Sequence, residues 1–221
     1  MPFSPFHLIA ALLLLAFMVA FIQVGALTIA FDKLGLSPES GFALLLVSLL
    51  GSAINLPLFR MKANPPPPDT FMVPLAGRLL RIRPPPFTGS TVIAINVGGG
   101  LVPVFFSAYL FRHTPIDATT ALLAIAIVTF VCYAYSRPIP GLGIGMPIFV
   151  APLSAALTAV LLDGDASAPL AYICGSLGVL LGADILRLRD IPRLGAPIAS
   201  IGGAGTFDGI FITGIVAVLL A

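Results

Sequence analysis

Three observations in the sequence predict an all-α membrane protein, a polytopic bundle of about seven helical spans. Of the 221 residues, 58% are hydrophobic and only 9% are charged, with a mean hydropathy of +1.10. A soluble domain carries roughly a quarter charged residues, so lipid must replace water over much of this surface. The apolar residues also gather in stretches of the roughly 17 to 25 residues that a helical span requires. Gly and Pro interrupt several of these stretches.

The predicted spans make residues 1–221 a single transmembrane domain. The first stretch lacks a basic n-region and an Ala-x-Ala cleavage site and is too long for a signal-peptide core, so we expect it to be a span. Short connections join most of the helices. The seven spans are expected at about 6–31, 40–58, 91–111, 118–136, 146–162, 168–186 and 197–220.

The connection between the second and third spans, residues 59–90, is longer and different in composition. It contains PPPP and PPP, which cannot continue a helix and favour extended backbone. Between them, FMVPLAGRLLRIR mixes apolar residues with arginines. We expect this Pro/Arg-rich segment to lie on the cytoplasmic membrane surface, attracted to anionic lipid.

Basic residues indicate the orientation, because short loops rich in Lys and Arg stay in the cytoplasm. Only Lys33 and Arg112 follow odd-numbered spans. The sequence therefore predicts a multi-pass protein of the inner (cytoplasmic) membrane, with a cytoplasmic N-terminus and an external C-terminus. The other nine of the eleven basic residues are Arg60, Lys62, Arg78, Arg81, Arg83, Arg137, Arg187, Arg189 and Arg193.

Charge and residue types argue against several kinds of partner. A net charge of +2 does not indicate nucleic-acid binding. Cys132 and Cys174 lie in apolar runs without the spacing of a zinc site, and His7 and His113 lie near span ends. GLGIG and GGAG lack the strand-turn-helix context of a dinucleotide loop. We therefore expect no metal and no cofactor; the expected partners are the lipid bilayer and a membrane-protein substrate or partner, and the sequence leaves oligomers open.

Spans 3, 5 and 7 share Gly and Pro clusters where they leave the predicted cytoplasmic side. Gly costs about 1 kcal/mol relative to Ala inside a helix, so three such clusters at matched depth indicate breaks. Unwound backbone at membrane depth must line a wet cavity or be buried in protein. The alternative is close helix packing, and for Asn96 an interhelical hydrogen bond. The candidate binding residues around a cytoplasmic cavity are Asn96, Gly98, Gly99, Gly143, Gly145, Gly203 and Gly205.

Two of the nine acidic residues, Asp184 and Asp208, lie inside predicted spans. A carboxylate within a span is costly and normally faces a functional cavity. For Asp184 the alternative is an i, i+3 ion pair with Arg187. Asp208 has no basic residue within ten positions. If SIGGAGTF is irregular and the last helix begins near Phe207, the two aspartates lie at similar depth in antiparallel neighbouring helices and can share a proton as general acid and base.

This layout resembles the presenilin, signal-peptide-peptidase and prepilin-peptidase group of intramembrane aspartyl proteases. That resemblance assigns the two catalytic roles to Asp184, in GADIL, and to Asp208, which follows Gly203 and Gly205. The chain departs from that pattern because Phe207 rather than Gly precedes Asp208, and because Ala183 stands where a Tyr is common.

RDIPRLGAPIASIGGAGTFDGIFITGI, with NVGGG and RPIPGLGIGMP, also resembles a family of small prokaryotic membrane proteins called domain of unknown function 1614. That resemblance covers most of the chain and implies no activity.

The sequence leaves three classes of function open. The first is a di-aspartyl intramembrane hydrolase that uses Asp184 and Asp208 on a cytoplasm-facing cavity. The second is a transporter or channel for a small solute, an ion or a proton, with Asp208 in the binding site, because discontinuous helices around a buried acid are typical of transporters. The third is a non-catalytic subunit or assembly factor of a larger membrane complex.

Overall fold

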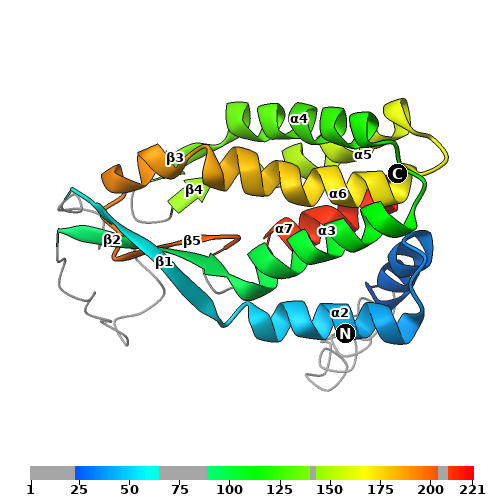
Figure 1. The fold of residues 1–221 in the computed structure, drawn as a ribbon, viewed down its shortest axis with the longest axis horizontal. Helices are drawn as coiled ribbons and strands as arrows, with labels where there is room; N and C mark the ends of the chain where they lie inside the picture. Colours follow the sequence, from blue (N-terminus) through cyan, green and yellow to red (C-terminus); the bar gives the residue numbers. More distant parts are fainter. Residues whose placement is uncertain (1–22, 65–88, 140–142, 204–208) are drawn as a thin grey trace, which may run out of the picture.

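A computed structural model describes residues 23–64, 89–139, 143–203 and 209–221. The described chain is mostly helical and forms a bundle from which a twisted three-stranded sheet projects at the end away from the C-terminus (Figure 1). The expectation of an all-α fold is therefore wrong for the described residues, because they include this sheet. The helical majority follows the apolar composition, whereas this sheet includes segments that hydropathy had assigned to spans.

Two helices at the start of the described chain form a sharp bend. Helix α1 (Gln23–Lys33) and helix α2 (Pro38–Gly51) meet at 107°. The hydroxyl oxygen of Ser37 caps α2 by accepting the backbone N–H of Ser40. From the end of α1, the ammonium group of Lys33 donates to the carbonyl of Val218 at 3.3 Å, which places a cation at the C-terminal end of the last helix. Most of the predicted span 6–31 lies outside the described residues.

The projecting sheet has the strand order β1-β2-β5. Strand β1 (Asn55–Lys62) is antiparallel to β2 (Ser90–Asn96), and β2 is parallel to β5 (Ile198–Ile201). The expected spans 40–58, 91–111 and 197–220 are thus partly strand. STVIAIN is rich in β-branched residues and alternates burial as a strand does, and a hydropathy window cannot distinguish such a run from a helix.

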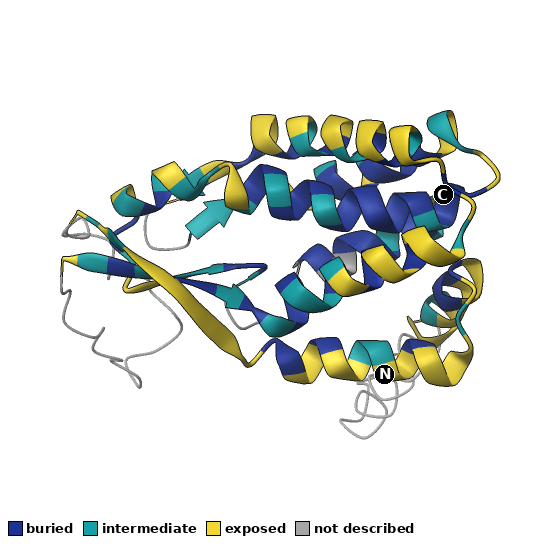
Figure 2. Cartoon of the chain, viewed as in Figure 1, coloured by how far each residue is buried: buried dark blue, intermediate teal, exposed yellow. Residues whose placement is uncertain are grey.

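The bundle surrounds one central helix, which Figure 2 shows as mostly buried. This is α6 (Ser167–Val179), which continues as a π-helical segment (Leu180–Ile185) and then a 3-10 turn (Leu188–Arg193). A short hairpin, β3 (Arg137–Ile139) with β4 (Gly143–Gly145), precedes α5. The helices around α6 are α3 (Val102–His113), α4 (Ala118–Tyr135), α5 (Val150–Leu162) and α7 (Gly209–Leu220).

Glycines let α6 approach its neighbours closely. A Cβ placed on Gly178 would lie 2.6 Å from Cγ1 of Val128, and one on Gly182 would lie 2.4 Å from the carbonyl oxygen of Thr129, both on α4. On the α5 side, a Cβ on Gly175 would lie 3.1 Å from Cβ of Ala155. Small residues of this kind allow backbones to pack tightly where lipid supplies no hydrophobic driving force.

Two described helices are long and apolar enough to cross a membrane: α4 and the continuous Ser167–Ile185. The bent α1–α2 pair makes a third if it counts as one span. Leucines at positions 153, 157 and 161 of the shorter apolar helix α5 are exposed, as expected for contact with lipid. The protein is therefore a membrane protein, and the count of seven spans stays a prediction.

Candidate functional site

Asp184 lies near the C-terminal end of the π-helical segment that continues α6. π-Helical turns are rare and recur at functional sites. The side chain is half-buried, and its Oδ2 accepts a hydrogen bond from the backbone N–H of Gly202 at 2.7 Å. Residue 202 directly follows β5. One hydrogen bond therefore joins the end of the central helix to the end of a strand 18 residues later.

Only glycine fits at position 202. Its φ is +84°, in the region that residues with a Cβ seldom adopt. A Cβ there would also lie 2.5 Å from the backbone nitrogen of Gly100 and 2.7 Å from the carbonyl carbon of Gly99. The second glycine cluster thus packs directly against the first, and this contact holds the N–H donor toward Asp184.

The first cluster, in NVGGG, forms a π-helical segment (Val97–Leu101) that is held by α2 and β1. The amide of Asn96 donates to the carbonyl of Ser52 at 2.7 Å, and its oxygen accepts the N–H of Gly99 at 2.8 Å. The hydroxyl of Ser48 donates to the carbonyl of Gly98 at 2.9 Å. Asn96 is 1% exposed. The polar groups of these predicted binding residues are engaged by protein, which favours the packing alternative for this cluster.

Two adjoining cavities border Asp184, and both are also lined by Ile144 and Gly203. The first, about 420 Å³, runs along β5. The second, about 650 Å³, lies between β4, the start of α5, the π-helical segment of α6 and the start of α7. The remaining residues of the first are Gly143, Ile191, Leu194, Ala196, Ile198, Ala199, Ser200 and Ile201. Those of the second are Met146, Pro147, Ile148, Phe149, Pro152, Val179, Ala183, Ile210, Thr213 and Val216.

Apart from Asn96, Gly98 and Gly99, the predicted residues divide into three groups. Asp184, Gly143 and Gly203 line the cavities. Gly145 packs inside its hairpin, where a Cβ would lie 2.4 Å from Cδ1 of Ile139. Asp208 and Gly205 lie outside the described residues.

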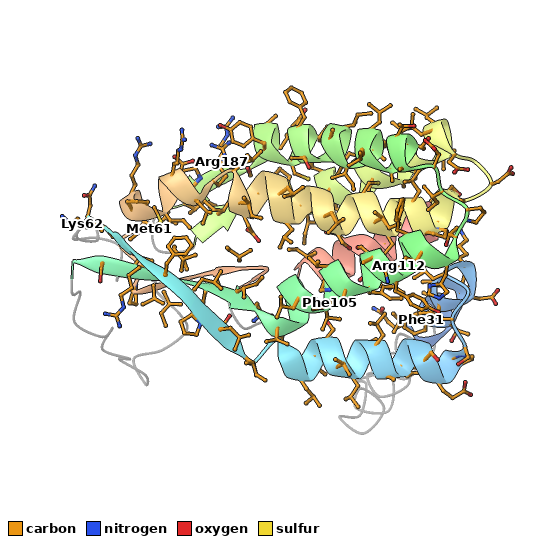
Figure 3. The ribbon with its side chains drawn as sticks, in the orientation of Figure 1. Phe31, Met61, Lys62, Phe105, Arg112 and Arg187 are labelled. Atoms are coloured by element: carbon orange, nitrogen blue, oxygen red, sulfur yellow. The ribbon has the colours of Figure 1, made fainter. Side chains whose placement is uncertain are left out.

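Arg187, the alternative partner of Asp184, is engaged elsewhere (Figure 3). Its guanidinium group donates to the carbonyls of Tyr133 and Ser136 at 2.7 Å each and lies 4.2 Å from the centre of the Tyr133 ring. Its ion pair, at 3.2 Å, is with Asp190. Arg187 therefore secures the C-terminal end of α4, and the described ion pairs do not support the i, i+3 interpretation of Asp184.

The sequence-based prediction missed two residues of the site, Gly202 and Thr213. Gly202 adjoins the predicted Gly203, and its role depends on a close approach by a segment about 100 positions earlier. Thr213 lies one helical turn past the start of α7, and its periodicity with Ile210 was the available signal. The described residues contain no group of three His, Cys, Asp or Glu side chains able to hold a metal ion.

The sequence profile of a family described as "Protein of unknown function (DUF1614)" matches residues 49–220. The chain belongs to this family. The matched range contains every residue that lines the two cavities, so the site lies within the part that defines the DUF1614 family. Comparison with curated proteins and with solved structures gave no significant match.

Proposed function

We propose that the protein is an intramembrane hydrolase that uses Asp184 and Asp208 as a catalytic pair. The observation that carries this proposal is the position of the Asp184 carboxylate, which borders both cavities beside the break in α6. Support for Asp208 comes from the chain on either side of it. Gly203 and Ile210 both line the second cavity. Asp208 directly precedes Gly209, the first residue of α7, and the Cα atoms of consecutive residues lie only about 3.8 Å apart.

The chemistry follows from two carboxyl groups that share one proton. The ionised carboxylate takes a proton from a water molecule as the water oxygen attacks the carbonyl carbon of an amide. The protonated carboxyl hydrogen-bonds the carbonyl oxygen and then gives its proton to the departing nitrogen. The N–H of Gly202 orients one oxygen of Asp184 during these steps. The products are a carboxylic acid and an amine, and no redox cofactor enters the balance.

The first cavity fits an extended peptide as substrate. β5 forms an edge of the sheet, and its four residues all line this cavity, which β4 borders on another side. Extended peptides bind to exposed strand edges through main-chain hydrogen bonds. A helical amide has its carbonyl engaged within the helix, so an extended segment presents the bond better to attack. The mostly apolar second cavity suits the neighbouring side chains of a membrane protein, which is the substrate class we propose.

The proposal is tested on the full-length protein in lipid nanodiscs with a photoreactive peptide that carries a hydroxyethylene isostere, a mimic of the tetrahedral intermediate. We expect labelling of the wild type and loss of labelling in Asp184→Asn and Asp208→Asn, which keep the shape of each side chain. Asp165→Asn, an exposed acid at the far end of α5, is the matched control and should label normally. Mass spectrometry of new peptide N-termini in membranes expressing each form measures cleavage directly.

Three results would count against hydrolysis. Labelling and cleavage that persist in both cavity variants would remove the carboxylates from the mechanism. Solute or proton flux into sealed vesicles, lost in Asp208→Asn without any cleavage by the wild type, would favour the transporter class instead. A stoichiometric partner that survives Asp208→Asn, again without cleavage, would favour the accessory class.

A further inference from the structure

A second, separate groove opens on the outer side of the bundle. Helices α3 and α4 both pack on α6, and the space between them measures about 410 Å³. Phe111 and Ala118, the lining residues nearest in sequence to the loop that joins the two helices, mark the loop end of the groove. Its walls are almost entirely apolar. They consist of Val104, Ser107, Ala108 and Phe111 from α3, Ala118, Ala121, Leu122 and Ile125 from α4, and Ile173 and Leu177 from α6.

The one polar side chain of α3 in this groove, Ser107, has an unused hydroxyl group. The residue is 1% exposed, and its Oγ has no hydrogen-bond partner among the described residues. A hydroxyl in apolar surroundings is costly unless it meets an acceptor. Serines in helices often satisfy themselves on a carbonyl of the preceding turn, as Ser154 does with Ala151. Ser107 is therefore a buried, unused donor in the wall of the groove, available to an acceptor that fills it.

Opposite charges stand on the two sides of the loop that joins α3 and α4. Arg112 lies in the last turn of α3 and is exposed (Figure 3). Asp117 caps the start of α4 and is also exposed. Hydrogen bonds from the Thr119 hydroxyl and the Thr120 and Thr119 N–H groups hold the pKa of Asp117 below its ordinary value, so it is anionic at neutral pH. Arg112 lies five residues, or about 7.5 Å along the helix, beyond Ser107.

We propose that this groove binds one acyl chain of a phospholipid with an ethanolamine headgroup. The phosphate would pair with Arg112, the amine with Asp117, and an ester carbonyl, which lies between phosphate and chain, would accept from Ser107. The volume favours a chain over a protein segment: one turn of a helix 10 Å wide occupies about 420 Å³, so the groove holds no more than a single turn. The site lies outside the two cavities that border Asp184, and this proposal does not depend on the proposed function.

Occupancy is measured by native mass spectrometry of the full-length protein during titration with phosphatidylethanolamine. Ala108→Phe places a ring in the groove and should weaken lipid binding at least about tenfold, the effect of displacing a bound chain. Ala126→Phe places the same ring on an exposed position of α4 outside the groove, and this variant should bind like the wild type. Equal thermal stability of the two variants separates lost binding from lost folding.

The hydroxyl and headgroup contacts have their own tests. The wild type should prefer ester-linked over ether-linked phosphatidylethanolamine by about fivefold, because the ether lacks the carbonyl acceptor, and Ser107→Val should abolish that preference. Arg112→Gln should weaken phosphatidylethanolamine and phosphatidylglycerol alike, by about fivefold. Asp117→Asn, which keeps the helix cap, should weaken only the ethanolamine lipid.

The proposal is overturned by any of three results. Lipid binding that is unchanged in Ala108→Phe would place the lipid outside this groove. A wild type that binds the ether and ester lipids equally would remove Ser107 from the site. A wild-type dimer that Ala108→Phe converts to monomers would identify a second copy of the chain as the occupant.

Discussion

Replacement of Gly202 by Ala tests whether the end of β5 positions Asp184. The new Cβ would have to adopt a φ of +84° and would lie 2.5 Å from the backbone nitrogen of Gly100, an atom that no rotamer change can move. The positive φ costs about 1 kcal/mol. Displacement of residue 202 also lengthens the 2.7 Å hydrogen bond to Asp184, and a bond to a charged group contributes roughly 1.5 to 3 kcal/mol. We expect a total loss of about 2.5 to 4 kcal/mol in the free energy of unfolding.

Gly35→Ala is the matched control for this prediction. Gly35 has a φ of +69°, but a Cβ there meets nothing within 4 Å. It therefore isolates the backbone term, at about 1 kcal/mol. Unfolding of both variants by sodium dodecyl sulfate in mixed micelles gives the two free energies. If Gly202→Ala loses no more than Gly35→Ala, the packing of Gly202 on Gly100 and its bond to Asp184 do not contribute as argued.

Three further predictions concern the packing and the caps. Gly182→Ala should cost about 1 to 3 kcal/mol in the same assay, because its Cβ would lie 2.4 Å from the carbonyl oxygen of Thr129. Gly164→Ala, whose Cβ would lie 4.0 Å from the carbonyl oxygen of Val160, should stay within about 0.5 kcal/mol of wild type. Arg187→Ala should lower the free energy of unfolding by about 2 to 4 kcal/mol, because it removes two hydrogen bonds to carbonyl groups and one ion pair. Arg187→Lys should recover only part of this stability, since an ammonium group cannot reproduce the forked geometry of the guanidinium group. A full recovery by Arg187→Lys would contradict this geometry. Because the pKa of Asp117 is lowered in the folded protein, its capping contribution is present at neutral pH. The contribution is lost as the pH falls below the ordinary pKa of 3.8 and through the lower pKa of the folded state. Thermal midpoints between pH 3 and 6 should show the start of this loss in the wild type and a smaller change in Asp117→Asn.

Much of the site could be predicted because it depends on local chemistry. Asp184 was identifiable as a carboxylate in an apolar run, and the Gly clusters as breaks in would-be helices. The third and seventh predicted spans also match each other in sequence at an offset of 105, which pairs Ile93 with Ile198. The structure places these segments side by side as the parallel strands β2 and β5, with Ile93 opposite Ala199 and Val92 opposite Ile198. The register of the strands therefore corresponds to an offset of 106, one residue away from the sequence match.

Other features depended on partners that are distant in the sequence. From the sequence, Asn96 fits a ligand site and an interhelical hydrogen bond equally well. The structure shows that its side-chain amide hydrogen-bonds to the backbone of Ser52 and Gly99. Arg187 stands three residues from Asp184 and is the obvious local partner, yet the carbonyl groups at the end of α4, about 50 positions earlier, bind it instead. A hydrogen-bond partner is selected by distance in space, which spacing along one helix does not encode.

By itself, the sequence determined that the protein lies in lipid, that most of it is helical and where its helices are interrupted. The transfer of a side chain to lipid and the backbone preferences of Gly and Pro are properties of each residue and its neighbours. Only the tertiary structure decided what the broken segments became. A strand is stable only with a partner, so STVIAIN and IASI turned from predicted helix into sheet through their pairing across about 100 residues. The same pairing brings the N–H of Gly202 to Asp184. Asp184 borders the two cavities in which we place the proposed chemistry.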